Sequence, residues 1–109
     1  MAASKLLVER TRHLLSRRRG ITEKKMFGGV CFLLNGNMLV AVWNDSLIAR
    51  VGIEQAITAL KEPDVREMDI TGRPMKGWVI VDPEGIDSDR QLSHWIDLST
   101  VFAQTLPAK

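Results

Sequence analysis

The chain has 109 residues, 45% of them apolar and 26% charged, a composition typical of one soluble domain with a single core. It has one cysteine, no apolar run of roughly 18 residues and no apolar secretory segment, which argues against disulfide scaffolds, membrane-spanning proteins and secreted proteins. We therefore expect one domain over residues 1–109, located in the cytoplasm. The net charge of +2 is unevenly placed, because residues 1–25 carry eight basic and two acidic residues whereas the rest of the chain has a net charge of −4.

The first predicted element is a helix that begins after Ser4 and runs to about Arg19. Ser4 is a favourable N-cap residue, and Gly20 is a typical helix stop. Arg17–Arg19 would occupy the last helical turn, where cations complement the helix dipole. The apolar stripe of this helix consists of Leu7, Thr11, Leu14 and Leu15.

Four strands are expected next, over residues 22–27, 30–34, 38–43 and 46–51. Asn35-Gly36 predicts a tight hairpin turn between the second and third strands, because both residues tolerate positive φ. Asn44-Asp45 predicts another turn. Gly28-Gly29 indicates a bend or bulge where the sheet begins, since two glycines weaken regular pairing.

A short helix over residues 53–61 and two strands over residues 65–71 and 77–81 follow. The short helix has Ile53, Ala56, Ile57 and Leu60 at helical spacing. A last helix begins near Asp87 or Ser88, because Ser88 and Gln91 have the spacing of a capping box. Its predicted buried stripe consists of Leu92, Trp95, Ile96, Ser99, Phe102, Ala103 and Leu106. The order of helix, four strands, helix, two strands and helix predicts an α+β domain with helices packed on an antiparallel sheet.

The N-terminal basic residues form a candidate basic patch. It consists of Arg10, Arg12, Arg17, Arg18, Arg19, Lys24 and Lys25. One interpretation is a surface that faces nucleic acid, with at most weak DNA contact. The other is a solvated helix face followed by a basic helix end.

Candidate catalytic and metal-binding residues are few. Cys31 has apolar neighbours and no base nearby in the sequence, which favours a buried cysteine over a nucleophile. His13 and His94 show no metal-ligand spacing. Gly28-Gly29 fits neither the dinucleotide nor the Walker phosphate-binding pattern. We therefore expect no enzyme activity, no catalytic residues, no metal and no cofactor.

The loop Gly72–Gly77 is the strongest candidate for an interaction site. It carries Arg73 and Lys76 together with Met75, a side chain suited to adaptable contacts, and Trp78 follows. We predict that it recognises an anionic partner or an acidic protein patch. The alternative is a plain connector between two strands.

The strands over residues 30–34 and 38–43 are apolar on both faces instead of alternating. If helices cover one face, a second copy of the chain is a candidate cover for the other. This pattern predicts a homodimer.

Four segments together resemble the TfoX N-terminal domain family, which includes the N-terminal half of bacterial competence regulators. These are KKMFGGVCFLLNGNMLVAVW, DSLIARVG, DITGRPMKGWVIVDPEG and WIDLSTVFAQTLPAK. The resemblance covers nearly the whole chain, from about Leu7 to Lys109. It implies a secretion-chaperone-like fold and a link to competence-gene regulation, in which two-domain members resemble co-activators of a DNA-bound transcription factor. The second domain of those regulators is not in this chain, so we expect a stand-alone form of the first.

These observations lead to three functional hypotheses. The first is a non-catalytic regulatory domain that binds a protein of the transcription machinery or a regulator. The second is a small-ligand-binding protein or enzyme that uses the loop with Arg73 and Lys76, which requires a concave pocket there. The third is a chaperone-like binder of peptides at an exposed sheet edge.

Overall fold

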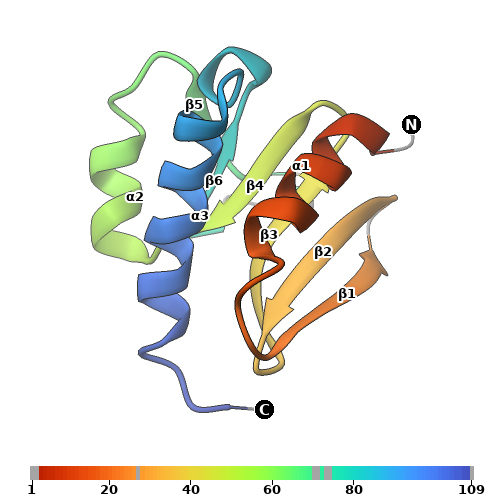
Figure 1. Cartoon of the computed structure of the whole chain (residues 1–109). Helices are drawn as coiled ribbons and strands as arrows, with labels where there is room; N and C mark the ends of the chain where they lie inside the picture. Colours follow the sequence, from red (N-terminus) through yellow and green to blue (C-terminus); the bar gives the residue numbers. More distant parts are fainter. Residues whose placement is uncertain (1–2, 27, 70–71, 73–74, 109) are drawn as a thin grey trace.

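The computed structural model describes residues 3–26, 28–69, 72 and 75–108, which form one antiparallel sheet and three α-helices (Figure 1). The strands are β1 (Ile21–Met26), β2 (Gly29–Leu34), β3 (Asn37–Trp43), β4 (Ser46–Arg50), β5 (Val65–Glu67) and β6 (Trp78–Val81). The helices are α1 (Lys5–Leu15), α2 (Ile53–Ala59) and α3 (Asp89–Ala103), with a short 3-10 helix, η1 (Pro83–Gly85), before α3. The predicted α+β class is confirmed.

The strands lie in the order β1-β2-β3-β4-β6-β5, so β1 and β5 are the edges of the sheet. Leu34 pairs with Asn37 across the predicted hairpin turn, where Asn35 and Gly36 both have positive φ, at 52° and 84°. Positive φ at both central residues is what a two-residue hairpin loop requires. The turn predicted at Asn44 is also present, with φ of 53°.

Of the bend or bulge predicted at Gly28-Gly29, the bulge is wrong, and Gly28 lies in a turn. Gly29 pairs in regular register with Met26 of β1, and Gly28 lies with positive φ between these two strands. The irregularity of the sheet instead falls between Phe32 and Leu33 in the pairing of β2 with β3. Gly29 is required for close approach, because a Cβ atom there would overlap the carbonyl oxygen of Val42.

The first helix ends at Leu15, four residues before the predicted end at Arg19. The hydroxyl group of Ser16 donates to the carbonyl oxygen of His13 at 2.7 Å, and the amide of Arg18 donates to the carbonyl oxygen of Leu15 at 3.0 Å. These short-range bonds compete with the helical pattern and tighten the chain into turns. Arg17 therefore lies outside the helix.

The fifth strand ends at Glu67, short of the predicted end at Thr71, which lies outside the described residues. Met68 leaves the strand and is 1% exposed, and its carbonyl oxygen accepts a hydrogen bond from the amide of Met75 at 2.9 Å. Burial of this side chain against the sheet takes the chain out of the strand direction.

The capping box predicted for the last helix is confirmed. The Ser88 hydroxyl oxygen accepts from the amide of Gln91, and the Gln91 side chain accepts from the amide of Ser88. Most of the predicted stripe of α3 is buried, but Phe102 and Leu106 are only half-buried. Phe102 lies at the candidate site described below.

The central strands β2 and β3 are largely buried on both faces, as their apolar sequences predict, whereas the edge strand β1 is mostly exposed. In Figure 1, α1 and α3 lie over the same face, where Phe32 and Leu47 belong to the main core. The opposite face, called the far face below, has a smaller apolar cluster. It consists of Cys31, Ala41, Ile48, Met68 and Ile80. The chain itself supplies part of the cover of the far face, through Met68 and the partly buried Met75.

Candidate functional site

The described residues that surround Trp78 form the most distinctive surface of the molecule. Trp78 begins β6, and it borders two neighbouring hollows of about 630 Å³ and about 260 Å³ that also share Ile53, Lys76 and Gly77. We call this region the Trp78 surface. It consists of Arg50, Ile53, Ile57, Leu60, Met75, Lys76, Trp78, Val101 and Phe102.

Exposed apolar side chains are concentrated on this surface. Ile53, Ile57 and Val101 are 58%, 60% and 65% exposed, and Leu60 also borders the smaller hollow. Among the described residues, the other strongly exposed large apolar side chains are Leu6 and Met26, at the far end of the sheet from α2. Four of six exposed apolar side chains in one region indicate an interaction site, because single exposed apolar residues are normal but clusters are not.

The residues of α2 expose their large side chains because the helix packs through small ones. Ala56 and Ala59 are buried in the main core, which brings the helix close to the sheet and α3. The sequence pattern combines Ala56 with Ile53, Ile57 and Leu60 in one apolar stripe. In the structure Ala56 is the one member of that stripe that is buried.

Arg50 lies between two aromatic rings at the edge of the larger hollow. Its guanidinium carbon is 5.2 Å from the centre of the Trp78 ring and 5.4 Å from the centre of the Phe102 ring. Arg50 and Trp78 are direct partners across β4 and β6, which fixes the first contact. Such cation–π contacts hold the charge in place while part of its donor set stays free for a ligand.

Two glycines allow this arrangement. Gly52 has φ of 89°, and a Cβ atom there would lie 2.6 Å from the Phe102 ring. The amides of Val51 and Gly52 both donate to the carbonyl oxygen of Gly77, at 3.0 Å and 3.1 Å. The larger hollow is therefore lined in part by a close backbone contact between the residues that follow β4 and the residue that precedes β6.

The structure brings together three of the four residues predicted for the interaction loop. Met75 is half-buried against the far face, Lys76 is exposed, and Trp78 is half-buried between the two hollows. Arg73 lies outside the described residues. The concave pocket that a small-ligand site requires is present beside Lys76 and Trp78.

The candidate basic patch is divided by ion pairs. Arg10 contacts Asp89 at 3.1 Å, Arg12 contacts Glu23 at 2.8 Å, and Arg18 contacts the carboxylate of Asp97 at 2.6 Å. Lys24 and Lys25, on β1, are both exposed. They point to opposite faces, because Lys24 pairs with Cys31 and Lys25 with Val30. Arg17 and Arg19 are exposed in the turns after α1.

The bidentate ion pair of Arg12 with Glu23 shifts the pKa values of both side chains. The hydrogen bonds from Arg12 lower the pKa of Glu23 below its ordinary value. The same contacts, together with the negative charge of Glu23, raise the pKa of Arg12. This pair fixes α1 against the edge strand β1.

Cys31 is fully buried in the far-face cluster, and burial raises the pKa of its thiol. A raised thiol pKa opposes the thiolate that a nucleophile needs. His94 is exposed, and its ring packs edge-on against Trp95, with 5.1 Å between the two ring centres. Across residues 3–26, 28–69, 72 and 75–108, no three His, Cys, Asp or Glu side chains are grouped to hold a metal ion.

The sequence pattern placed six members of this surface only in strands or helices, without a role in binding: Arg50, Ile53, Ile57, Leu60, Val101 and Phe102. For α2 the sequence does contain a signal that its isoleucines can be exposed, because the helix has one stripe of alanines and another of isoleucines, and only one of the two can face the core. No sequence signal places Phe102 beside Arg50, since that contact depends on how α3 crosses the sheet.

Residues 13–103 match the family described as the TfoX N-terminal domain. The chain belongs to this family. Membership indicates a regulatory, competence-related domain. No curated protein and no solved structure matches the chain. No helix among the described residues has the length and apolar character that crossing a membrane requires.

Proposed function

We propose that this protein is a non-catalytic regulatory domain of the bacterial cytoplasm that binds another protein through the Trp78 surface. The partner is a component of the transcription machinery or a transcriptional regulator, by analogy with the competence co-activators that the family includes. The observation that carries this proposal is the gathering of exposed Ile53, Ile57 and Val101 around Trp78 and Arg50.

The composition of the Trp78 surface supports protein binding. Tryptophan and arginine are the residues most often found at binding hot spots, where a rigid ring and a planar cation fill a pocket of the partner. Here both are held in place by intramolecular contacts, so little side-chain freedom is lost on binding. Exposed aliphatic side chains on α2 and α3 surround them and supply area that binding removes from water.

Paired substitutions test this proposal. Ile57→Asp places a charge on the Trp78 surface at a position that is 60% exposed, and Leu6→Asp makes the same kind of change at a 69% exposed position on α1. Affinity capture from bacterial lysate with quantitative mass spectrometry should recover a set of proteins with the wild type and with Leu6→Asp, but not with Ile57→Asp. Equal recovery with all three proteins would show that the Trp78 surface is not the docking face.

Small-ligand binding is a second candidate function, because the hollow of about 630 Å³ has the size of ligand sites. Arg50, Lys76 and Trp78 at its edge favour an aromatic anion. Titration of tryptophan fluorescence with a library of metabolites distinguishes this candidate from protein binding. A saturable change that Lys76→Ala removes would favour the ligand, and its absence would favour the protein partner.

Direct DNA contact by the basic patch is at most a weak contribution to this function. The ion pairs of Arg10, Arg12 and Arg18 with Asp89, Glu23 and Asp97 reduce the charge available to phosphates. If DNA binds directly, its affinity falls steeply with salt, and charge reversal at Arg17–Arg19 abolishes it. Measurement of binding to a labelled duplex at two salt concentrations tests this point.

We also propose that the protein forms a homodimer through the far face or a sheet edge. Leu33, Met38 and Trp43 surround the far-face cluster and are only partly buried. Met68 and Met75 already cover part of this face, so the dimer contact would be smaller than an open sheet face provides. Size-exclusion chromatography with light scattering at micromolar concentration should give the mass of two chains, and a purely monomeric result would remove the dimer.

A further inference from the structure

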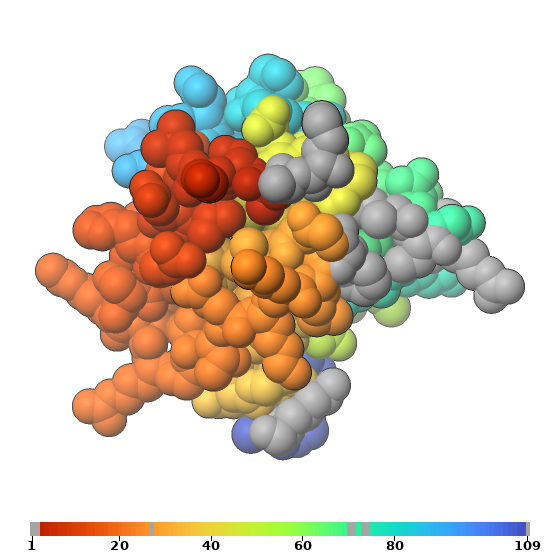
Figure 2. Space-filling model, turned by 90° about the vertical axis from the view of Figure 1, so that its right-hand side faces the viewer, coloured from red at the N-terminus to blue at the C-terminus, as the bar shows by residue number. Residues whose placement is uncertain are grey.

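Another hollow, separate from the two at the Trp78 surface, lies between α1 and the β1–β2 hairpin, on the face of the molecule that Figure 2 shows. It has a volume of about 540 Å³, within the range of small-molecule sites. It shares no residue with the Trp78 surface. Its walls consist of Ala3, Lys5, Val8, Glu9, Arg12, Lys25, Met26, Gly28, Gly29 and Val30.

We propose that this α1–β1 cleft binds a small organic phosphate that carries an apolar group. The proposal rests on the charge of the walls, on the apolar floor between them and on the bare backbone at one end. It is independent of protein binding at the Trp78 surface.

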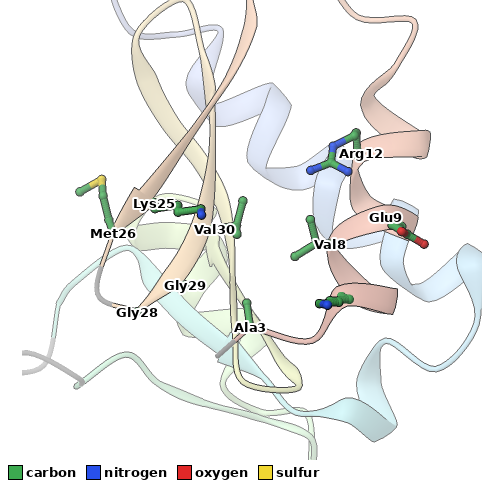
Figure 3. A pocket seen from close by; sticks show the side chains of 10 residues that line it. Ala3, Val8, Glu9, Arg12, Lys25, Met26, Gly28, Gly29 and Val30 are labelled. Atoms are coloured by element: carbon green, nitrogen blue, oxygen red, sulfur yellow. The ribbon is translucent and has the colours of Figure 1, made fainter. Parts of the chain in front are cut away.

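The charges of the cleft come from separate elements. Figure 3 shows Arg12 from α1 and Lys25 from β1 directed toward the space between the two, whereas the carboxylate of Glu9 points away. Three cations and one carboxylate line the cleft, but Arg12 is paired with Glu23, so among the described residues Lys5 and Lys25 are its cations without a paired carboxylate. A phosphate monoester carries about −1.5 to −2 charges at neutral pH, so it can engage both ammonium groups at once, whereas a carboxylate carries a single charge.

The ion pair of Arg12 with Glu23 orients this cation. Its Nε and one terminal nitrogen donate to the two carboxylate oxygens of Glu23, each at 2.8 Å. The other terminal nitrogen keeps its donors for a ligand. Among the described residues no carboxylate is paired with Lys5 or Lys25, so both ammonium groups are available.

Two apolar side chains of the cleft can contact the apolar part of the ligand. Val8 and Val30 face each other across the cleft between the cations (Figure 3). Gly28 is exposed and borders one end of the cleft without a side chain, so oxygen atoms of a ligand can approach the backbone there, whereas Gly29 is buried with its backbone close to the carbonyl oxygen of Val42. Gly28-Gly29 lacks a phosphate-binding sequence pattern, and it is the packing of α1 beside the β1–β2 hairpin that places Lys5 and Arg12 in the same cleft.

The test is a nuclear magnetic resonance titration of the ¹⁵N-labelled full chain with phenyl phosphate, inorganic phosphate and benzyl alcohol. Phenyl phosphate should give saturable shifts at the amides of Val8, Gly28 and Val30, and the two partial probes should bind more weakly. Equal binding of inorganic phosphate would contradict the apolar part of the proposal. Shifts centred on Trp78, or no saturable shifts, would contradict the site itself.

Neighbouring lysines provide a matched pair of variants. Lys25→Ala should lower the affinity for phenyl phosphate by about tenfold, since it removes one charge-assisted contact. Lys24→Ala removes the same charge from the opposite face of β1 and should change the affinity by less than about twofold. Equal losses in the two variants would mean that the anion is attracted by overall charge and has no defined site. Retained affinity in Lys25→Ala would also overturn the proposal.

Discussion

Substitution of Gly52 by alanine should destabilise the protein strongly, because two separate costs meet at this position. Gly52 has φ of 89° and ψ of 159°, a backbone region that only glycine occupies readily. An alanine held there costs about 1–3 kcal/mol of conformational strain. Its Cβ atom would also lie 2.6 Å from the ring of Phe102, and such overpacking typically costs about 1–3 kcal/mol more.

The expected loss is therefore about 2–6 kcal/mol, a large fraction of the total stability of about 5–15 kcal/mol of a domain. Urea denaturation followed by the fluorescence of the three tryptophans measures it. Gly72→Ala is the control, because Gly72 also has positive φ, of 88°, yet no described atom lies within 4 Å of its Cβ position. It should cost only about 1–2 kcal/mol.

A double-mutant cycle with Phe102→Ala separates the two costs of Gly52→Ala. In the Phe102→Ala background the overlap with the ring is absent, so Gly52→Ala should cost less by about 1–3 kcal/mol. A cost that is the same in both backgrounds, within about 0.5 kcal/mol, would refute the packing of Phe102 over Gly52. It would also remove the basis for the Arg50 contact with Phe102 at the Trp78 surface.

Three further predictions concern the rest of the fold. Ser88→Ala should lower the free energy of unfolding by about 1 kcal/mol through loss of the capping box with Gln91, as urea denaturation would measure. Cys31 should react with a thiol reagent far more slowly in the native protein than in urea, because it is fully buried and its thiol pKa is raised; fast native labelling would contradict this burial. Glu23 has a lowered pKa in the folded state, so its ion pair with Arg12 stabilises the fold above the ordinary pKa of 4.5, and this contribution is lost as the pH falls through the lowered value. Denaturation curves between about pH 6 and pH 3 should therefore show a small additional loss in the wild type relative to Glu23→Gln, small because the pair is exposed, and identical pH profiles would contradict it.

The local sequence determines the turns and caps of this fold well. Asn35-Gly36 and the pair of Ser88 with Gln91 were predictable, because each depends on residues within four positions of one another. The ends of α1 and β5 were not predictable to the same degree. They depend on Ser16, whose hydroxyl group bonds to the preceding turn, and on Met68, whose burial takes the chain over the far face.

The candidate site could be predicted only in part, for a similar reason. The sequence indicated Met75, Lys76 and Trp78 because they lie in or beside one loop between glycines. Arg50 and Phe102 complete the site from β4 and α3, and their contact depends on Gly52 permitting α3 to lie close. Ile57 is exposed because Ala56 is buried in its place. The sequence contains both apolar stripes, and only the packing of the folded chain shows which of them is buried.

Several basic residues of the N-terminal segment form ion pairs within the protein, and this is one reason to propose a protein partner in place of a nucleic acid. Residues 1–25 have a net charge of +6, so in the sequence the positive charges lie close to one another. In the fold, Arg10 and Arg18 reach across to Asp89 and Asp97 of α3, and these ion pairs hold α1 beside α3. Together with Arg12, which pairs with Glu23, three of the eight basic residues in this segment thus serve contacts between elements. The exposed apolar residues beside Trp78 have no such internal use, since they lie on the outer side of α2 and α3. Binding by this protein is therefore expected to depend on apolar contact more than on charge, and its partner affinity should respond weakly to salt.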